Sequence, residues 1–480
     1  MNFRPVFYVI GLLLGVLAIS MTFPMLVDLH MGNADWKVFF ICSVITSFFG
    51  GMLILTNTSS QINITIREGF LLTSLSWIIL GIFAALPFWF SEFGLSLTDA
   101  VFEAISGITT TGATVIAGLD DAAPGLLLWR ALLQWLGGIG IIVMALSLLP
   151  FLNIGGMQLF RTESSENEKA LPRAAQLATS IFVIYLGLSV LCTACYILAG
   201  FSIFDAVAHA MTTISTGGFS TYDTSFAAHD NSWKELVAIV FMICGALPFV
   251  IYLKASQGNW SVILYDSQIR WFFAILGSAI AILITWRMIY SDIDLWNTFI
   301  HVTFSATSVM TGTGFSNTDY GLWRNFPVAI FFFLMVVGGC AGSTTCGIKI
   351  FRFQVLYEVT NAQIRQLLNP HGVFTPMYNG EPIPSGVPMA VMSFFFVFAL
   401  CFSILAIMLS LTGLDFITAM SASASAISNV GPGLGPIIGP SGNFASLSDT
   451  AKWLLSIGMI LGRLELFTIL VLLLPRFWRP

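Results

Sequence analysis

The chain has 480 residues, of which 57% are apolar and only 9% charged, and its mean hydropathy is +0.89. Soluble globular proteins carry about a quarter charged residues, so the composition excludes a soluble enzyme and indicates an integral membrane protein. Long apolar segments separated by short polar loops favour membrane helices over an outer-membrane barrel. The formal net charge of −5 is small and gives no argument for a nucleic-acid partner.

Ten apolar segments are long enough to be predicted as membrane helices. They lie near 6–28, 36–56, 69–91, 126–150, 176–200, 233–254, 270–290, 324–365, 386–411 and 452–475. The first follows Arg4 as a signal peptide would, but no clear cleavage site follows it, so it is predicted to be a membrane helix. The segment 324–365 is too long for one span.

The seven cysteines all fall inside or beside apolar segments, so no disulfide framework is predicted. The spacing of Cys192 and Cys195 resembles half of a metal site, but no second pair or histidine follows it. We therefore interpret both as packed or lipid-facing side chains.

The distribution of basic residues predicts the orientation. If the loops near 57–68, 151–175, 254–270 and 349–385 and both termini face the cytoplasm, twelve of the 19 Lys and Arg residues lie on that side and six on the other, with Arg463 inside the last span. The positive-inside rule then places both termini in the cytoplasm. Sixteen of the 24 acidic residues lie outside, where they would concentrate cations.

Four shorter stretches rich in Ser, Thr and Gly resemble one another. They lie at 99–114, 204–219, 296–315 and 415–433, and contain ISGITTTGAT, TTISTGGFST, SVMTGTGFSN and AISNVGPGLG. Aligning Gly112, Gly218, Gly314 and Gly431 gives intervals of 106, 96 and 117 residues. Each unit has a long apolar helix, a short helix of 10–14 residues, a glycine-centred turn and a second apolar helix.

Two further features recur in these units. The short helix is predicted to begin near an N-cap residue, and the second long helix often opens with a Trp beside a basic residue, as an interfacial anchor. The N-caps are Asp99, Asp205, Asn297 and Asp415, and the anchors are Trp129-Arg130, Trp233-Lys234, Trp323-Arg324 and Lys452-Trp453.

Irregular backbone at membrane depth is tolerated only where it lines a cavity. A half-crossing helix that ends in such a turn directs its negative end and then a run of carbonyl oxygens at one point. Glycine supplies the left-handed backbone angles that this requires. Four such turns around one axis predict a ring of oxygens that can replace the water shell of a monovalent cation. The alternative, that Gly and Thr merely ease helix packing, explains four corresponding copies poorly.

These residues resemble the Trk/Ktr/HKT superfamily of potassium transporters, and specifically its bacterial TrkH branch. The resemblance covers essentially the whole chain and includes QWLGGIGI (134–141), GGCAGSTTCGIK (338–349) and GRLELFT (462–468) besides the four turns. It implies an all-α integral membrane protein with four tandem M1–pore helix–M2 repeats in pseudo-fourfold arrangement around one pore, plus an N-terminal helix pair. The implied divisions are 1–60 for the helix pair and 61–155, 156–260, 261–372 and 373–480 for the repeats.

The resemblance further implies that backbone oxygens of a selectivity filter bind potassium, the transported ion. The filter residues are Thr110, Thr111 and Gly112, Thr216, Gly217 and Gly218, Gly312, Thr313 and Gly314, and Asn429, Val430 and Gly431. The fourth loop departs from the others through Asn429 and Pro432. We expect this loop to loosen the ring and weaken discrimination between potassium and sodium.

A gate is expected below the filter. Small and polar residues interrupt the over-long segment in its middle, and the resemblance makes this an intramembrane loop that gates the pore. The gate residues are Gly338, Gly339, Gly342, Ser343, Thr344, Thr345, Gly347, Lys349 and Arg463. An Arg at mid-bilayer costs roughly 2.5–3.5 kcal/mol, so Arg463 is expected to face a cavity or a partner. The resemblance implies that it points into the pore, where its charge opposes passing cations.

Four other polar residues have open roles. His209 and His301 favour hydrogen-bonded packing over a proton relay, Glu465 is expected to pair with another helix, and Glu103 stabilises its own helix or polarises the outer mouth. A channel-like potassium uptake protein is the preferred function, a proton- or sodium-coupled symporter the second, and an intramembrane enzyme a remote third, since no HExxH motif is present.

The resemblance implies the remaining partners and the location. The expected partners are a second copy in a homodimer, membrane lipid, and a cytosolic nucleotide-binding ring protein (TrkA-like) that docks on loops such as 151–175 and 254–270. No cofactor is expected in the chain itself, and the implied location is the bacterial cytoplasmic membrane.

Overall fold

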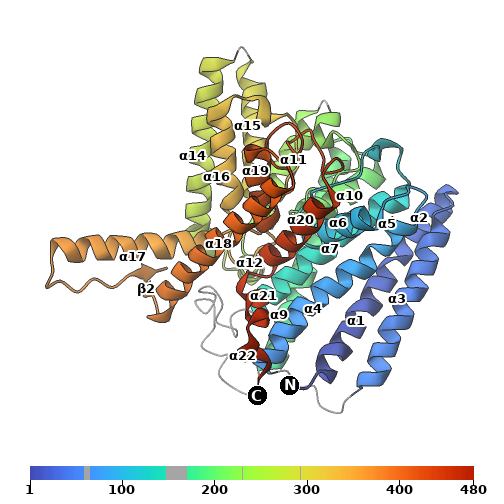
Figure 1. Ribbon diagram of the computed structural model, residues 1–480. Helices are drawn as coiled ribbons and strands as arrows, with labels where there is room; N and C mark the ends of the chain where they lie inside the picture. Colours follow the sequence, from blue (N-terminus) through green and yellow to red (C-terminus); the bar gives the residue numbers. More distant parts are fainter. Residues whose placement is uncertain (59–64, 148–169, 230, 292, 480) are drawn as a thin grey trace.

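The computed structural model describes residues 1–58, 65–147, 170–229, 231–291 and 293–479, apart from the side chains of 145–147 and 170–175. Long helices run side by side, with shorter helices inserted between them (Figure 1). Seven helices or continuous helix pairs of the described residues are long and apolar enough to cross a membrane, and nine if two bent pairs each count as one span. The predominantly helical membrane fold agrees with the sequence.

The first two spans form a separate pair at one side of the molecule (Figure 1). The first consists of α1 (Arg4–Ser20) and α2 (Thr22–Met31), and the second is α3 (Trp36–Asn57). The two spans cross at Gly11 and Gly50, where an added Cβ on Gly11 would lie 2.8 Å from the Gly50 carbonyl oxygen. Small residues at such a crossing let membrane helices approach closely.

Helices of the long apolar segments then alternate with helices of the four shorter stretches. The first set comprises α4 (Ile66–Ala84) with α5 (Leu86–Phe90), α7 (Pro124–Ser147), α9 (Ala170–Leu198), α11 (Ser232–Ala246) with α12 (Phe249–Ser256), α14 (Ser267–Tyr290), α16 (Asn325–Val336), α18 (Gly386–Leu411) and α20 (Asp449–Arg463) with α21 (Phe467–Leu470). The second set, which we call the short helices, comprises α6 (Leu97–Ile108), α10 (Ile203–Ile214), α15 (Leu295–Met310) and α19 (Phe416–Ser428). Each short helix lies at one of the four predicted stretches.

Three predicted spans are broken. The predicted interruption of 324–365 is present as a loop between α16 and α17 (Ile350–Leu368). The segments 233–254 and 452–475 were predicted as continuous spans, and this is wrong: α11 and α12 meet at 92°, and α20 meets the following helix at 104°. Pro248 supplies no backbone N–H at the first break, and Glu465 and Leu466 have left-handed φ angles of 61° and 48° at the second.

Two elements within residues 350–382 are not part of the bundle of membrane-spanning helices. Helix α17 extends away from the other helices (Figure 1). It is followed by a two-residue antiparallel hairpin, β1 (Met377–Tyr378) with β2 (Glu381–Pro382), which the sequence did not predict. The hairpin contacts the start of α14, where the Ser267 N–H donates to Asn379 Oδ1 at 3.1 Å.

The predicted starts of the short helices need correction. The side chains that cap them belong to Ser96, Ser202, Asp294 and Asp415. Only Asp415 was predicted, and the other predicted caps lie three residues inside the helix, where their own N–H groups donate to the true cap. The Trp129–Arg130 anchor is also wrong, because both side chains are buried, whereas Trp233 is 71% exposed as an interfacial anchor would be.

Candidate functional site

The four short helices end in the same way. In each, the N–H of the residue before the aligned glycine donates to a Ser or Thr carbonyl five residues earlier, at 2.8–3.0 Å. The donor–acceptor pairs are Thr111–Ser106, Gly217–Thr212, Thr313–Ser308 and Val430–Ser425. This is the Schellman cap, which requires a left-handed residue just before the donor.

That left-handed residue is present in all four loops, and the aligned glycine repeats the conformation two positions later. The first positions have φ angles of 54°, 50°, 69° and 52° at Thr110, Thr216, Gly312 and Asn429. The second positions have φ angles of 83°, 79°, 83° and 104° at Gly112, Gly218, Gly314 and Gly431. The backbone of the twelve predicted filter residues therefore alternates in the same way in every loop.

The four loops contact one another in chain order. A Cβ added to the glycine of one loop would meet the carbonyl oxygen of the central residue of the next. The pairs are Gly112 with Gly217, Gly218 with Thr313, Gly314 with Val430, and Gly431 with Thr111, the last at 2.8 Å. The fourth loop thus returns to the first, and the four turns form a closed ring, which we call the glycine ring.

Two positions of the glycine ring carry local strain. Thr110 and Thr216 are β-branched residues with left-handed backbones, which cost roughly 1–2 kcal/mol each. Both threonines are buried, and the Thr110 hydroxyl has no hydrogen-bond partner among the described atoms. Strain of this kind persists where the surrounding structure over-determines the conformation, and it is typical of functional sites.

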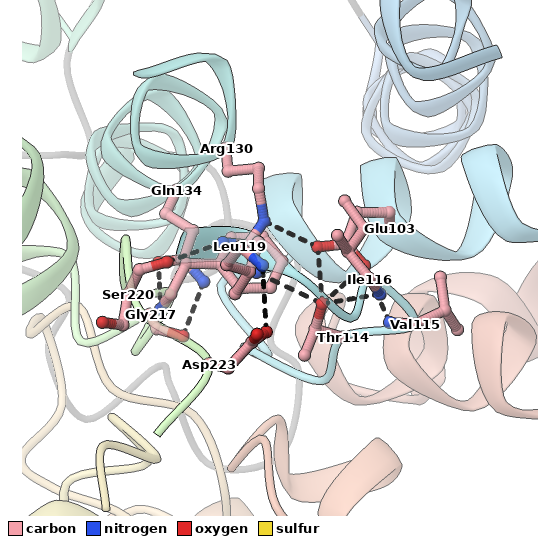
Figure 2. A network of polar contacts seen from close by, with 11 residues as sticks. Glu103, Thr114, Val115, Ile116, Leu119, Arg130, Gln134, Gly217, Ser220 and Asp223 are labelled. Carbon is pink, nitrogen blue, oxygen red and sulfur yellow. Dashed lines mark hydrogen bonds and ion pairs between the residues drawn. The ribbon is translucent and has the colours of Figure 1, made fainter. Parts of the chain in front are cut away.

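A buried ion pair braces the loops that follow the first two short helices (Figure 2). Arg130 Nε on α7 lies 2.8 Å from Glu103 Oε1 on α6, and the same Arg donates through Nη1 to the Ser220 carbonyl at 2.7 Å. Glu103 also accepts the Val115 N–H at 3.0 Å and the Thr114 hydroxyl at 3.0 Å. Glu103 therefore fixes the loop that follows its own helix, a role that the sequence did not predict.

Side chains from neighbouring helices hold the other loops. Gln134 on α7 donates to the Gly217 carbonyl at 2.6 Å and accepts the Phe219 N–H at 3.0 Å (Figure 2). Glu235 on α11 accepts from the Asn317 amide at 2.8 Å, beyond the third glycine. The sequence displayed Gln134 within QWLGGIGI but gave no signal that its amide reaches the second loop.

Asn429, which departs from the threonine or glycine of the other loops, is tied on two sides. Its Nδ2 donates to Thr111 Oγ1 at 2.8 Å and to the Met459 carbonyl on α20 at 2.9 Å. The side chain thus joins the fourth loop to the first. The expected loosening of the ring stays a prediction, but this contact opposes it.

The interrupted stretch between α16 and α17 packs against the break between α11 and α12. Its Cys340 N–H donates to the Ala246 carbonyl at 3.1 Å, and the Phe249 N–H donates to the Gly342 carbonyl at 2.9 Å. The Thr344 hydroxyl donates to the Gly245 carbonyl at 2.9 Å and lies 3.1 Å from the Thr216 hydroxyl of the glycine ring. The stretch 338–347 is therefore in direct contact with the second loop.

Arg463 connects this stretch to two other helices. The side chain is 1% exposed, and its Nη1 lies 3.2 Å from the Thr344 carbonyl and 2.6 Å from Cys346 Sγ. Its Nη2 donates to the Gly137 carbonyl on α7 at 2.9 Å. The guanidinium thus holds the stretch 338–347 against the first and last units.

The other residues predicted for the gate form local contacts within the stretch or beside it. Ser343 donates to the Cys340 carbonyl at 2.6 Å, and Thr345 accepts the Gly339 N–H at 3.1 Å. Gly342 and Gly347 have left-handed φ angles of 75° and 70°, and the Gly338 N–H donates to the Ile348 carbonyl at 3.0 Å. The Lys349 ammonium donates to the hydroxyl and carbonyl oxygens of Thr345.

Glu465 pairs with a different helix, as expected. Its carboxylate forms a buried ion pair with Arg352 on α17. The guanidinium of Arg352 also lies over the Phe394 ring at 3.7 Å. The break after α20 is therefore tied to the helix that follows the stretch 338–347.

The histidines and cysteines do not gather at a metal site. His209 is buried and hydrogen-bonded to the Asp205 carbonyl and the Ser220 hydroxyl, as the packing interpretation expects, and His301 is half-buried in α15. All seven cysteines are free thiols. Within the described ranges, no three His, Cys, Asp or Glu side chains are placed to hold a metal ion.

The chain is similar to a protein family, to curated proteins and to a solved structure. The family model TrkH, described as "Cation transport protein", matches residues 36–479. The "Trk system potassium uptake protein TrkI" of Halomonas elongata is 44% identical over 100% of this chain and 97% of its own length. TrkH of Escherichia coli is 35% identical over the full length of both chains. The chain also matches the crystal structure of the potassium transporter TrkH from Vibrio parahaemolyticus with a TM-score of 0.93. The two sequences are 36% identical, and the match covers 100% of each chain.

Proposed function

This chain belongs to the TrkH family of cation transport proteins, and we propose that it takes up potassium across the bacterial cytoplasmic membrane through the glycine ring. The family consists of transport proteins, so we do not retain the intramembrane-enzyme alternative. Potassium is the transported ion in this proposal, not a resident cofactor.

The observation that carries the proposal is that each of the four loops contacts the next and the fourth contacts the first. Each loop follows the negative C-terminal end of a short helix, and its alternating left-handed residues lie in the same ring. Backbone carbonyls so arranged can replace the hydration shell of a potassium ion. The strained threonines and the unpartnered Thr110 hydroxyl support a role for the inner end of the ring in holding the ion.

The stretch 338–347 acts as the gate in this proposal, together with Arg463. The Cys340 N–H and the Gly342 carbonyl contact the break after α11. The Thr344 hydroxyl contacts the second loop, and the Thr344 carbonyl contacts the Arg463 guanidinium. The Arg charge beneath the ring would repel an incoming cation. Release of its bonds to Thr344 and Gly137 would let the stretch move.

We favour a channel-like mechanism over a coupled symporter because Glu103 and Glu465, the two carboxylates that the sequence offered for a relay, are both ion-paired. A proton relay requires a carboxylate that is free to change its protonation state. Glu103 is ion-paired with Arg130, and Glu465 with Arg352. Both side chains are therefore engaged in holding the structure together.

The assembly completes the proposal. We propose the division into an N-terminal pair and four repeats, with both termini in the cytoplasm, a homodimer, and a TrkA-like nucleotide-binding ring protein as regulator. The N-terminal and C-terminal segments both contact the start of α4, through Asn2 with Glu68 and Arg479 with Arg67, which supports their lying on one side. Of the two expected docking loops, most of 151–175 lies outside the described residues, whereas 254–270 is described.

Reconstitution into liposomes tests the proposal. We expect tracer rubidium uptake to follow the membrane voltage, to be inhibited by potassium more strongly than by sodium or lithium, and to be unchanged by a proton gradient at fixed voltage. Uphill rubidium accumulation driven by the proton gradient alone would instead establish a symporter.

A further inference from the structure

A cavity of about 710 Å³ lies away from the glycine ring, where α13 (Ser261–Tyr265), the start of α14, α17 and the β1–β2 hairpin meet. Two cations, Lys254 and Arg270, and two carboxylates, Asp266 and Glu358, line it. The cavity therefore offers charges of both signs and no excess of either.

Gln354 on α17 lines the same cavity and is only 4% exposed. Neither its amide nitrogen nor its amide oxygen has a hydrogen-bond partner among the described atoms. A buried amide without partners costs roughly 1–3 kcal/mol, so native structures rarely leave one unpaired. A ligand with both donors and acceptors would satisfy both of its polar atoms.

The rim of the cavity has the character of a membrane interface. Leu264 and Tyr265 on α13 are 74% and 75% exposed, and the preceding Trp260 is 68% exposed. Aromatic and aliphatic side chains on a short surface helix insert at the level of the lipid headgroups. These exposed side chains beside the cavity favour a bilayer lipid as its occupant.

We propose that this cavity binds the headgroup of a zwitterionic phospholipid that carries a phosphate and a primary ammonium group. Lys254 and Arg270 are suited to the phosphate, because guanidinium and ammonium groups form charge-assisted bonds to phosphate oxygens. Asp266 and Glu358 are suited to the ammonium group. A purely anionic headgroup would leave both carboxylates facing a like charge.

The site is connected to the stretch 338–347. Asp266 caps α14, and two residues later Gln268 Oε1 accepts the Ala341 N–H at 2.9 Å. Gln354 lies on α17, which begins directly after that stretch. A headgroup held between α14 and α17 would therefore hold both supports of the stretch in place.

Native mass spectrometry of the purified full-length protein tests the binding. We expect phosphatidylethanolamine to be retained at least about fivefold more than phosphatidylglycerol or phosphatidylcholine at equal concentration. Arg270→Gln should reduce its retention about tenfold, and Glu358→Gln should remove the preference over phosphatidylcholine, whose methylated ammonium cannot donate hydrogen bonds. Gln354→Leu should weaken retention, whereas Gln366→Leu, the same change at an exposed site on α17, should not.

Equal retention of the three lipids, or unchanged retention in Arg270→Gln and Glu358→Gln, would overturn the proposal. Displacement of the lipid by an equal concentration of soluble glycerophosphoethanolamine would overturn the assignment to a bilayer lipid and indicate a free metabolite. Because this measurement does not involve ion flux, its outcome is independent of the proposed transport function.

Discussion

At the scale of single residues, the glycine ring places two demands on the same four positions. The aligned glycines must adopt left-handed φ angles, and they must also leave room for the carbonyl of the next loop. An alanine fails the first demand at a cost of roughly 1–2 kcal/mol and fails the second through overlap with backbone atoms, which cannot rotate away. Glycine is therefore the one residue that fits.

Gly218→Ala tests this double demand. A Cβ at Gly218 would overlap the carbonyl group of Thr313, so we expect the ring to distort and the preference for potassium over sodium to fall at least about tenfold, equivalent to about 1.4 kcal/mol. Competition of sodium against tracer rubidium in liposomes measures it. Gly413→Ala is the control, because Gly413 has a φ angle of 93° but no atom within 4 Å of an added Cβ. Equal preference for potassium over sodium in both variants would show that the glycine ring is not the selectivity filter.

Arg463 gives a second prediction at this scale. Replacing it with Ala removes the charge beneath the ring and the bonds to Thr344 and Gly137, so we expect potassium flux to rise severalfold. Arg463→Lys keeps the charge but cannot span both carbonyls, and its flux should lie between those of Ala and Arg. Unchanged flux in a folded Arg463→Ala protein would identify this Arg as a purely structural residue.

At the scale of elements, the second long helices of the last three units are broken next to one another. The stretch 338–347 contacts the break after α11, and Arg352 on α17 pairs with Glu465 at the break after α20. Inside a bilayer, the backbone N–H and C=O groups freed at such breaks need hydrogen-bond partners from the protein. Here residues at one break bond to residues at the next. A change at one break is therefore expected to act on the others.

The Arg352–Glu465 pair tests that dependence. Glu465→Gln leaves the Arg352 charge buried without its partner, and we expect it to lower the free energy of unfolding by about 3–5 kcal/mol. Adding Arg352→Met should recover most of this loss. The unfolding midpoint in detergent measures both, with Arg365→Gln, at an exposed position of α17, as the control. Additive losses in the double variant would show that the two charges do not depend on each other.

Much of this architecture is readable from the sequence, and the remainder has a common cause. Apolar runs and the four glycine-centred turns predicted the spans and the short helices, because these signals are local and repeat. The breaks at Pro248 and Glu465 were missed because the hydropathy of a segment does not report a change in the direction of its helix axis. The partners Arg130 with Glu103 and Gln134 with Gly217 lie 27 and 83 residues apart, and no local pattern reports such pairs.

At the scale of the whole molecule, a closed ring requires the last unit to contact the first. Besides Gly431 with Thr111 in the ring itself, the Phe444 N–H donates to the Thr114 carbonyl at 2.8 Å. In addition, Lys452 Nζ on α20 lies 2.6 Å from Asp99 Oδ1 on α6, and the Lys side chain is 5% exposed. This ion pair joins residues 353 positions apart and holds the two ends of the repeat array together.

Reversing the charges of this pair tests whether closure of the ring supports selectivity. Asp99→Lys places two cations together at the junction, and we expect a lower unfolding midpoint and a loss of preference for potassium over sodium. Adding Lys452→Asp restores an opposite pair and should recover most of both. Asp121→Lys, the same change at an exposed position, separates this effect from a weaker attraction of cations to the protein surface. If the double reversal is no better than Asp99→Lys alone, the junction between the first and last units is held by the backbone contacts and not by this ion pair.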